Sequence, residues 1–254
     1  MSTDSSVISV NNISKSYGEK LVLRNVNFHM TAGERLAILG AGGSGKSTLL
    51  KIMLGIVSPD HGSIELLGKN VFDTTRAERE QLLRSIGMAF QQGALFDFMT
   101  VRENIIFAME NMTTMSREDM ETRVKNMLCA VNLPHAAQKI PSQLSGGMRR
   151  RVGIVRALAT NPQIALLDEP TAGLDPVTSR TVVDMIHNLG EQVGSSLICV
   201  TSSVEVAFSF SNRVAILRDG MLVADGTWDS IHAIGDKWIN HFLDVRGFKP
   251  EVAP

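Results

Sequence analysis

A glycine-rich segment near residue 40 has the residue types and spacing that bind phosphate. It reads Gly40-Ala41-Gly42-Gly43-Ser44-Gly45-Lys46-Ser47-Thr48. This matches a glycine, four residues and then Gly-Lys-Ser, in which glycines let backbone N–H groups turn towards phosphate oxygens. The Lys46 ammonium would reach the outer phosphates, and the Ser47 hydroxyl would hold Mg²⁺. A flexible turn is the alternative, but an apolar strand before the loop and a helix after it favour the phosphate site.

Two carboxylates follow a later apolar run. Ile164-Ala165-Leu166-Leu167 is followed directly by Asp168 and Glu169. Asp168 would bind Mg²⁺ through its water shell, and Glu169 would polarise a water that attacks the outermost phosphate. Carboxylates at the end of a strand can simply be solvated, but together with the phosphate loop they predict a site for nucleotide hydrolysis.

The elements that must position these motifs alternate along the chain. Short apolar runs, which suit parallel strands buried on both faces, occupy residues 36–39, 86–90, 164–167, 197–200 and 214–217. Helical patterns occupy residues 46–54, 101–109, 120–131, 146–160 and 177–193. This alternation predicts an α/β fold.

Two segments depart from the alternation. Residues 7–10 and 21–30 resemble strands with no helix between them, so we expect an antiparallel β patch at the N-terminal end. Residues from about 92 to 160 are almost all helical, which predicts an inserted helical subdomain. The expected organisation is an ATPase-type domain over 1–235, with its core at about 1–91 and 161–235, and a C-terminal tail over 236–254.

Composition narrows the function classes. The chain has 254 residues and a formal net charge of −1, which gives no electrostatic support for a nucleic-acid partner. No run approaches the roughly 18 apolar residues that span a bilayer, and the start lacks the pattern of a signal peptide. Cys129 and Cys199 lie in apolar segments, so we expect both to be buried reduced thiols, which is consistent with the cytosol. We expect Arg149-Arg150-Arg151 to be a solvated helix face.

Further motifs resemble those of ABC ATPases. Leu144-Ser145-Gly146-Gly147-Met148 resembles the family's LSGGQ signature, at the family's spacing from Asp168 and Glu169. Gln91 resembles the Q-loop glutamine, Asp175 lies in a segment that resembles the D-loop, and Tyr17 occupies the place of the aromatic that stacks on adenine. The resemblance covers residues 7–230 and implies a P-loop (RecA-like) core, with ATP and Mg²⁺ as cofactors and Gln91 as a third Mg²⁺ ligand beside Ser47 and Asp168.

The resemblance also implies a dimer. Ser145, Gly146 and Gly147 expose a hydroxyl and amides at the start of a helix, which is an anion site. In the family this site closes on the γ-phosphate held by the other subunit. A homodimer with two-fold symmetry would therefore share two ATP molecules between its subunits.

One position departs from the family pattern. A histidine usually follows the strand after the D-loop, but here Thr201 is followed by Ser202. Ser202 can donate one hydrogen bond but reaches less far than an imidazole. We therefore expect hydrolysis by Glu169 with slower turnover, and a module that binds ATP without useful turnover is an alternative.

The segment after Gln91, the residues that follow the signature and the tail from Asp236 resemble the ATPases of Mla/Mce-type phospholipid transporters. This implies a permease of the MlaE type, an MCE-domain protein and a small STAS-domain partner resembling MlaB, with the chain as a peripheral protein on the cytoplasmic face of the inner membrane. Transport of another solute and a soluble ABC protein acting on ribosomes or DNA are alternatives.

The tail carries large apolar residues in a helical stripe. They are Trp238, Ile239, Phe242 and Leu243. We expect the stripe to dock on the second copy of the chain, and packing on its own domain is the alternative.

Overall fold

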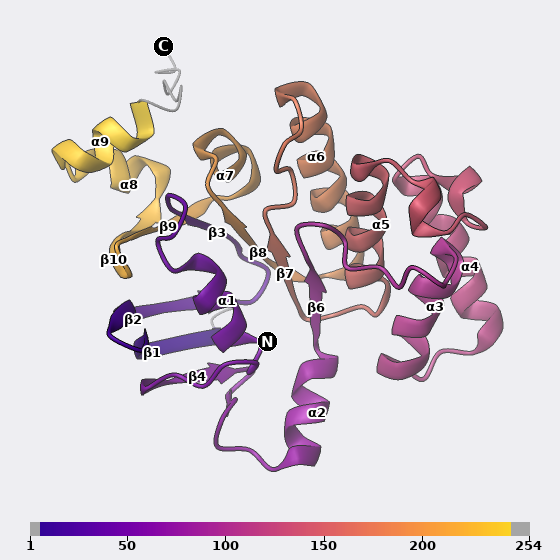
Figure 1. Ribbon diagram of the computed structural model, residues 1–254, viewed down its shortest axis with the longest axis horizontal. Helices are drawn as coiled ribbons and strands as arrows, with labels where there is room; N and C mark the ends of the chain where they lie inside the picture. The colour runs from indigo at the N-terminus through magenta and orange to yellow at the C-terminus, as the bar shows by residue number, and fades with distance from the viewer. Residues whose placement is uncertain (1–5, 245–254) are drawn as a thin grey trace. The chain divides into compact units, whose positions relative to one another are not determined.

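The computed structural model describes residues 6–244 (Figure 1), and these residues form two compact units. Unit 1 comprises residues 31–33 and 73–198, and unit 2 comprises residues 6–30, 34–72 and 199–244. The chain is a mixture of strands and helices, which confirms the predicted α/β class. Among the described residues, no helix is both long and apolar enough to cross a bilayer.

Unit 2 contains a four-stranded sheet in the order β2-β1-β4-β5. Its strands are β1 (Ser6–Tyr17), β2 (Lys20–Thr31), β4 (His61–Leu66) and β5 (Lys69–Asn70). β1 pairs antiparallel with β4, with Ile8 opposite Leu66 and Val10 opposite Ile64, and all four side chains are buried. The expected antiparallel patch is therefore confirmed, and β4 and β5 extend it beyond the strands that the sequence indicated.

The remaining strands of unit 2 carry the phosphate loop. β3 (Arg35–Leu39) pairs parallel with β9 (Arg213–Arg218), which pairs antiparallel with β10 (Met221–Thr227). Leu36 to Leu39 are all buried, as expected for a strand covered on both faces. Four helices belong to this unit: α1 (Lys46–Met53), α7 (Val204–Phe210), α8 (Trp228–Ala233) and α9 (Lys237–Asp244). β8 (Ser196–Thr201) begins in unit 1 and ends in unit 2.

Helix α9 lies beside α8 and packs on the core of its own unit (Figure 1). Ile239, Phe242 and Leu243 are buried in a cluster that includes Leu39 of β3 and Ile231 of α8. Asp236 begins the helix, because its Oδ1 accepts from the amides of residues 238 and 239 at 2.8 and 2.9 Å. Three of the four stripe residues are therefore covered by their own domain. The expectation that this stripe faces a second copy is wrong for those three, and residues 245–254 of the predicted tail lie outside the described residues.

Unit 1 contains β6 (Ile86–Ala89) and β7 (Ile164–Asp168), which pair in parallel with Ile86 opposite Ile164. Its α-helices are α2 (Arg76–Arg84), α3 (Val101–Met112), α4 (Arg117–Ala130), α5 (Gly146–Ala159) and α6 (Pro176–Val193). Helices α3, α4 and α5 pack on one another within the predicted helical segment, 92–160 (Figure 1). Cys129 of α4 is exposed, so the expectation that it is buried is wrong, whereas Cys199 of β8 is buried as expected. Capping boxes begin α2 and α3, where Thr75 and Thr100 each exchange hydrogen bonds with a glutamate three residues later.

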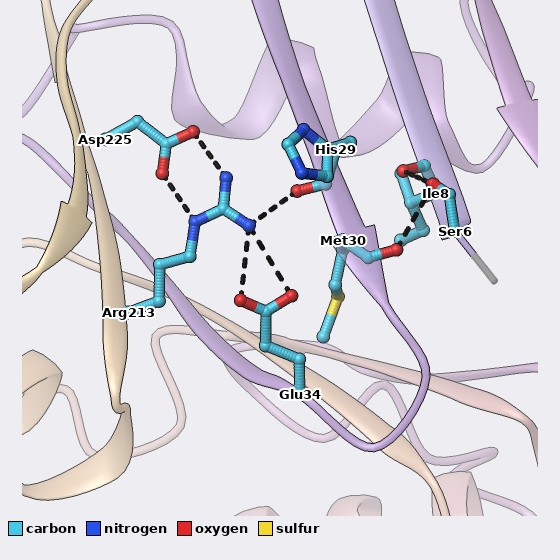
Figure 2. Close-up of polar contacts among 7 residues, drawn as sticks. All are labelled: Ser6, Ile8, His29, Met30, Glu34, Arg213 and Asp225. Carbon is cyan, nitrogen blue, oxygen red and sulfur yellow. Dashed lines mark hydrogen bonds and ion pairs between the residues drawn. The ribbon is translucent and has the colours of Figure 1, made fainter. Parts of the chain in front are cut away.

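A partly buried arginine joins the strands of unit 2 (Figure 2). Arg213 of β9 donates from Nε and Nη2 to both carboxylate oxygens of Asp225 on β10, at 2.7 and 2.6 Å. Its Nη1 donates to the His29 carbonyl of β2 at 2.8 Å and pairs with Glu34 at 3.2 Å. These carboxylates raise the pKa of Arg213, with the hydrogen bond to Asp225 as the largest cause. The Arg213 side chain is only 16% exposed, so its ion pairs lie in a partly desolvated site.

We expect Arg213→Ala to destabilise the protein by about 2 kcal/mol, because it removes the cation that two partly buried carboxylates, Asp225 and Glu34, both bind. Arg76→Ala is the matched control: Arg76 is 94% exposed and pairs with Glu80 within one helix, so its loss should cost no more than about 0.5 kcal/mol. Urea unfolding of both variants measures the difference. Equal losses would show that the Arg213 network does not stabilise unit 2.

Candidate nucleotide site

The phosphate loop of unit 2 joins β3 to α1, as the sequence predicts. Lys46 is the first residue of α1 and is 7% exposed. Its Nζ donates to the Gly40 carbonyl at 2.7 Å and to the Ala41 carbonyl at 3.0 Å. The ammonium therefore lies inside the loop, where it can neutralise a bound phosphate chain.

Packing accounts for the glycines at the two ends of the loop. A Cβ on Gly40 would lie 2.4 Å from the Leu217 carbonyl oxygen, and a Cβ on Gly45 would lie 2.7 Å from a Leu23 methyl. Gly45 also has a φ of +107°, in a region that L side chains rarely adopt. By contrast, Gly42 and Gly43 have nothing within 4 Å of an added Cβ. The loop is thus tightly packed at its ends and open in its middle.

The residues present fit a nucleotide phosphate with Mg²⁺. The open glycines leave room for close approach to the backbone, and the exposed Ser47 follows Lys46 in the first turn of α1. Ser44 Oγ is buried and has no hydrogen-bond partner among the described residues. When bound, Mg²⁺ neutralises charge on the β- and γ-phosphates, and Ser47, Gln91 and Asp168 are the ligands that the sequence predicts for it.

Two more predicted residues belong to unit 2. Tyr17 ends β1 and is 49% exposed, as a ring that stacks on a base requires. The segment before it is fixed by Asp60, which pairs with Lys15 at 2.7 Å and accepts from the Ser16 amide at 2.7 Å. The hydrogen bond from Lys15, followed by that from Ser16, lowers the pKa of Asp60.

Ser202 directly follows β8, next to the start of the phosphate loop. The Gly40 amide donates to the Thr201 carbonyl at 3.2 Å, which brings the end of β8 beside the end of β3. Ser203 begins α7 by accepting from the Val206 amide. The position where the family usually has a histidine therefore adjoins the loop, with a serine in it.

In unit 1, the signature segment begins α5. Ser145 is the N-cap, and its Oγ accepts from the Met148 amide at 3.2 Å. Gly146 has open space around it, and Gly147 has only a Leu174 methyl near an added Cβ, at 3.9 Å. The helix therefore presents bare backbone amides at its start, as an anion site requires.

The D-loop segment lies beside this helix start. Leu174 adjoins Gly147, and the following residue, Asp175, begins α6. Both oxygens of Asp175 accept from Thr178, one from the hydroxyl at 2.5 Å and one from the amide at 3.0 Å. These hydrogen bonds lower the pKa of Asp175, with the hydroxyl as the largest cause. Asp175 thus caps a helix, and its predicted contact with nucleotide stays a prediction.

The segment after Gln91 is attached to α5 by backbone contacts. A Cβ on Gly153 would lie 2.7 Å from the Gly93 Cα, and a Cβ on Gly93 would lie 2.7 Å from the Arg149 carbonyl oxygen. Arg156 donates to the carbonyls of Gly93 and Ala94 at 3.0 and 2.7 Å, and burial lowers the pKa of its guanidinium. The Q-loop and the signature helix therefore form one packed piece of unit 1. No sequence motif indicated this contact, because two glycines far apart in the chain are only a weak signal.

The three consecutive arginines of α5 contribute to the same packing. Arg150 Nε donates to the Gln91 carbonyl at 3.1 Å, Arg151 donates to the Val131 carbonyl at 2.9 Å, and Arg149 donates to the Leu144 carbonyl at 3.3 Å. The expectation of a solvated helix face is therefore wrong. Long arginine side chains satisfy loop carbonyls that have no partner in a helix or sheet.

Asp168 and Glu169 lie at the end of β7, where the sequence places them. Glu169 has a φ of +45°, which is uncommon for a residue with a side chain. Its carbonyl accepts from the Ala172 amide at 3.1 Å, closing a turn. The backbone turn, with its left-handed residue, therefore sets the direction of the carboxylate.

The structure groups the predicted residues by unit. Unit 2 brings together the phosphate loop and the residues at the end of β8, and it also holds Tyr17. Unit 1 brings together the signature, the segment after Gln91 and the D-loop, and it also holds Asp168 and Glu169.

Known proteins share this sequence and architecture. The ABC transporter family model matches residues 23–172. The spermidine/putrescine import ATP-binding protein PotA of Thermotoga maritima is 37% identical over 220 residues, which are 87% of this chain and 58% of PotA. The intermembrane phospholipid transport ATP-binding protein MlaF of Escherichia coli K12 is 33% identical over 238 residues, which are 94% of this chain and 88% of MlaF.

A solved dimer of the ATP-binding cassette MJ0796 with ADP and Pi superposes with a TM-score of 0.79 at 34% identity, covering 87% of this chain and 98% of that one. The chain therefore belongs to the ABC transporter family. It is an ATPase cassette, and its cofactors are ATP and Mg²⁺.

We expect Gly153→Ala to destabilise the protein by about 1 kcal/mol or more. Alanine normally gains about 1 kcal/mol over glycine inside a helix, but here the methyl group meets the Gly93 backbone, and overpacking costs about 1–3 kcal/mol. Gly146→Ala, at the open start of the same helix, is the control and should change stability by less than about 0.5 kcal/mol. Thermal and urea unfolding measure the stability of both variants. A stabilising effect of Gly153→Ala would contradict the tight contact between Gly153 and Gly93.

Proposed function

We propose that this chain is the ATP-hydrolysing subunit of a phospholipid transporter of the Mla/Mce type, working as a homodimer on the cytoplasmic face of the inner membrane. Its partners would be an MlaE-like permease, an MCE-domain protein and a small STAS-domain protein resembling MlaB. Similarity to MlaF over 94% of the chain supports the subfamily. Similar identity to PotA, whose name specifies polyamines, makes polyamine import the main competing assignment.

The observation that carries the transporter assignment is an aromatic surface that follows Gln91. Phe96, Phe98 and Phe107 are 39%, 79% and 40% exposed, and the Phe96 ring contacts both others, at 5.8 and 5.2 Å between centroids. Exposed aromatic residues gathered in this way are typical of protein interfaces. An apolar segment of a membrane subunit is a partner that would cover them.

A cavity of about 470 Å³ lies in the same segment. Ala94, Leu95 and Asp97 line it from the loop, and Arg149 and Arg150 line it from the signature helix. The buried side chain of Asn104 holds the loop in shape, because it accepts from the Phe96 amide at 2.8 Å and donates to the carbonyls of Phe96 and Met99 at 3.1 Å. A partner seated here would contact the helix that carries the proposed γ-phosphate site, so nucleotide binding and partner movement would be linked.

The assembly of the ATPase follows from the two anion sites. The phosphate loop holds the nucleotide, and Ser145 with the amides after it would bind the γ-phosphate from the second copy. Glu169 would then polarise the attacking water. The solved MJ0796 cassette is described as dimeric with ADP and Pi, which supports this arrangement.

We expect the tagged chain, purified from its native membrane, to bring with it a permease and an MCE-domain protein. Phe98→Ser should reduce this capture, since it places a polar group in the aromatic surface. Phe208→Ser is the control, because Phe208 is also an exposed phenylalanine, at 46%, but lies on α7 in unit 2, outside the aromatic surface. A permease without an MCE-domain protein would contradict phospholipid transport, and recovery of soluble partners alone would contradict the transporter assignment.

Ser202 favours a second candidate function, in which the chain binds ATP and turns over too slowly to drive transport. Ser202→His would add a longer donor towards the γ-phosphate. If part of a charged hydrogen bond, worth about 1.5–3 kcal/mol, acts only in the transition state, kcat should rise about tenfold. The measurement is phosphate release by the assembled complex at saturating ATP. An unchanged kcat, with wild type already near 1 s⁻¹, would exclude the slow module.

A further inference from the structure

The phosphate loop is supported by the turn between β9 and β10. The Gly220 amide donates to the Ser44 carbonyl at 3.1 Å, and the Gly220 carbonyl accepts from the Arg24 amide at 2.8 Å. The Leu217 carbonyl fills the space where Gly40 would carry a Cβ. The turn thus contacts the loop at Gly40 and at Ser44, on either side of the open glycines, and is itself bonded to β2.

Helix α9 reaches the same turn through Trp238. The guanidinium carbon of Arg218 lies 4.3 Å from the centroid of the Trp238 ring, which is a cation–π contact. The Trp238 ring also stacks on Phe242, with centroids 5.0 Å apart and the planes 11° from parallel. Together with residues 41–44 and the turn, Trp238 lines a cavity of about 240 Å³.

Helix α9 is held more firmly than the middle of the phosphate loop. Ile239 and Leu243 are 2% and 0% exposed, so α9 is fixed on the core and the Trp238 ring has little freedom. The middle of the loop has no side-chain packing, because an added Cβ on Gly42 or Gly43 meets nothing. The turn is therefore one of the contacts that hold the loop in place, beside the hydrogen bonds of Lys46 to the Gly40 and Ala41 carbonyls.

We propose that Trp238 is a positioning residue for ATP binding: it holds Arg218, and through the 217–220 turn it keeps the phosphate loop in its binding conformation. Trp238 does not touch the reacting atoms. The proposal rests on the ATPase activity of the cassette alone and does not depend on the transported substrate.

Affinity for Mg-ATP tests the proposal in the full chain. Trp238→Ala should weaken binding about fivefold, in line with the loss of one cation–π contact, and should raise KM while kcat at saturating ATP is retained. Trp238→Phe keeps a ring over Arg218 and should restore most of the affinity. Phe208→Ala is the control, since it removes an aromatic contact with Trp228, at 5.3 Å between centroids, that does not involve the loop. Wild-type affinity in Trp238→Ala, or an equal loss in Phe208→Ala, would overturn the proposal.

A double-mutant cycle keeps the test open even where Trp238→Ala fails to fold. Arg218 is 43% exposed on the turn, so Arg218→Leu leaves the core unchanged and should reproduce the loss of ATP affinity. Trp238→Leu keeps apolar volume but removes the ring, so it should weaken binding about fivefold by itself. Added to Arg218→Leu, it should weaken binding no further, because the partner of the ring is already gone. Wild-type affinity in Arg218→Leu, or additive losses in the double variant, would contradict the proposed connection.

Fluorescence provides a readout that a purely structural role would not change. The chain has two tryptophans, Trp228 and Trp238. Titration with Mg-ATP should change the emission of the wild-type protein, and Trp238→Phe should remove that change. An emission change that persists in Trp238→Phe would contradict the proposal that Trp238 senses the conformation of the phosphate loop. The absence of any emission change in the wild type would contradict it as well.

Discussion

Close packing at the two ends of the phosphate loop is the constraint on which the nucleotide site depends. Gly40 and Gly45 are pressed against Leu217 and Leu23 with no room for a side chain, while the glycines between them meet nothing. A backbone fixed only at its ends can keep its amides directed at a phosphate if those ends do not move. The ammonium of Lys46 adds to this order, because it binds two carbonyls of the same loop.

In unit 1, arginines of the signature helix α5 hold the neighbouring segment in place by donating to its backbone carbonyls. Arg150 and Arg156 extend from one helix to the backbone of the segment after Gln91, and Gly153 lets that segment touch the helix. The helix that begins with Ser145 therefore cannot shift without carrying this loop and the neighbouring aromatic surface with it. The proposed γ-phosphate site and the proposed partner surface are in this way built on one element of unit 1.

How much the sequence predicts depends on how local the relevant interactions are. The phosphate loop, the Asp168–Glu169 pair and the signature are contiguous, so their spacing and flanking apolar runs predicted the elements that carry them. The role expected of the signature came from its resemblance to the ABC family. Strand β4 was missed because its apolar residues alternate with polar ones over only six positions, and α7 because it has only seven residues. The arginine contacts and the packing of α9 join residues far apart in sequence, and periodicity alone cannot identify the surface that covers a stripe.

Glu169 shows what this architecture implies for protein engineering. Its left-handed backbone is a conformation that glycine or asparagine adopts with less strain. A search for stabilising substitutions would therefore favour replacing this residue, even though its carboxylate is the group proposed to act on water. The residue best for folding and the residue best for hydrolysis differ at this position, so thermostability selected without an activity screen would tend to yield an inactive cassette.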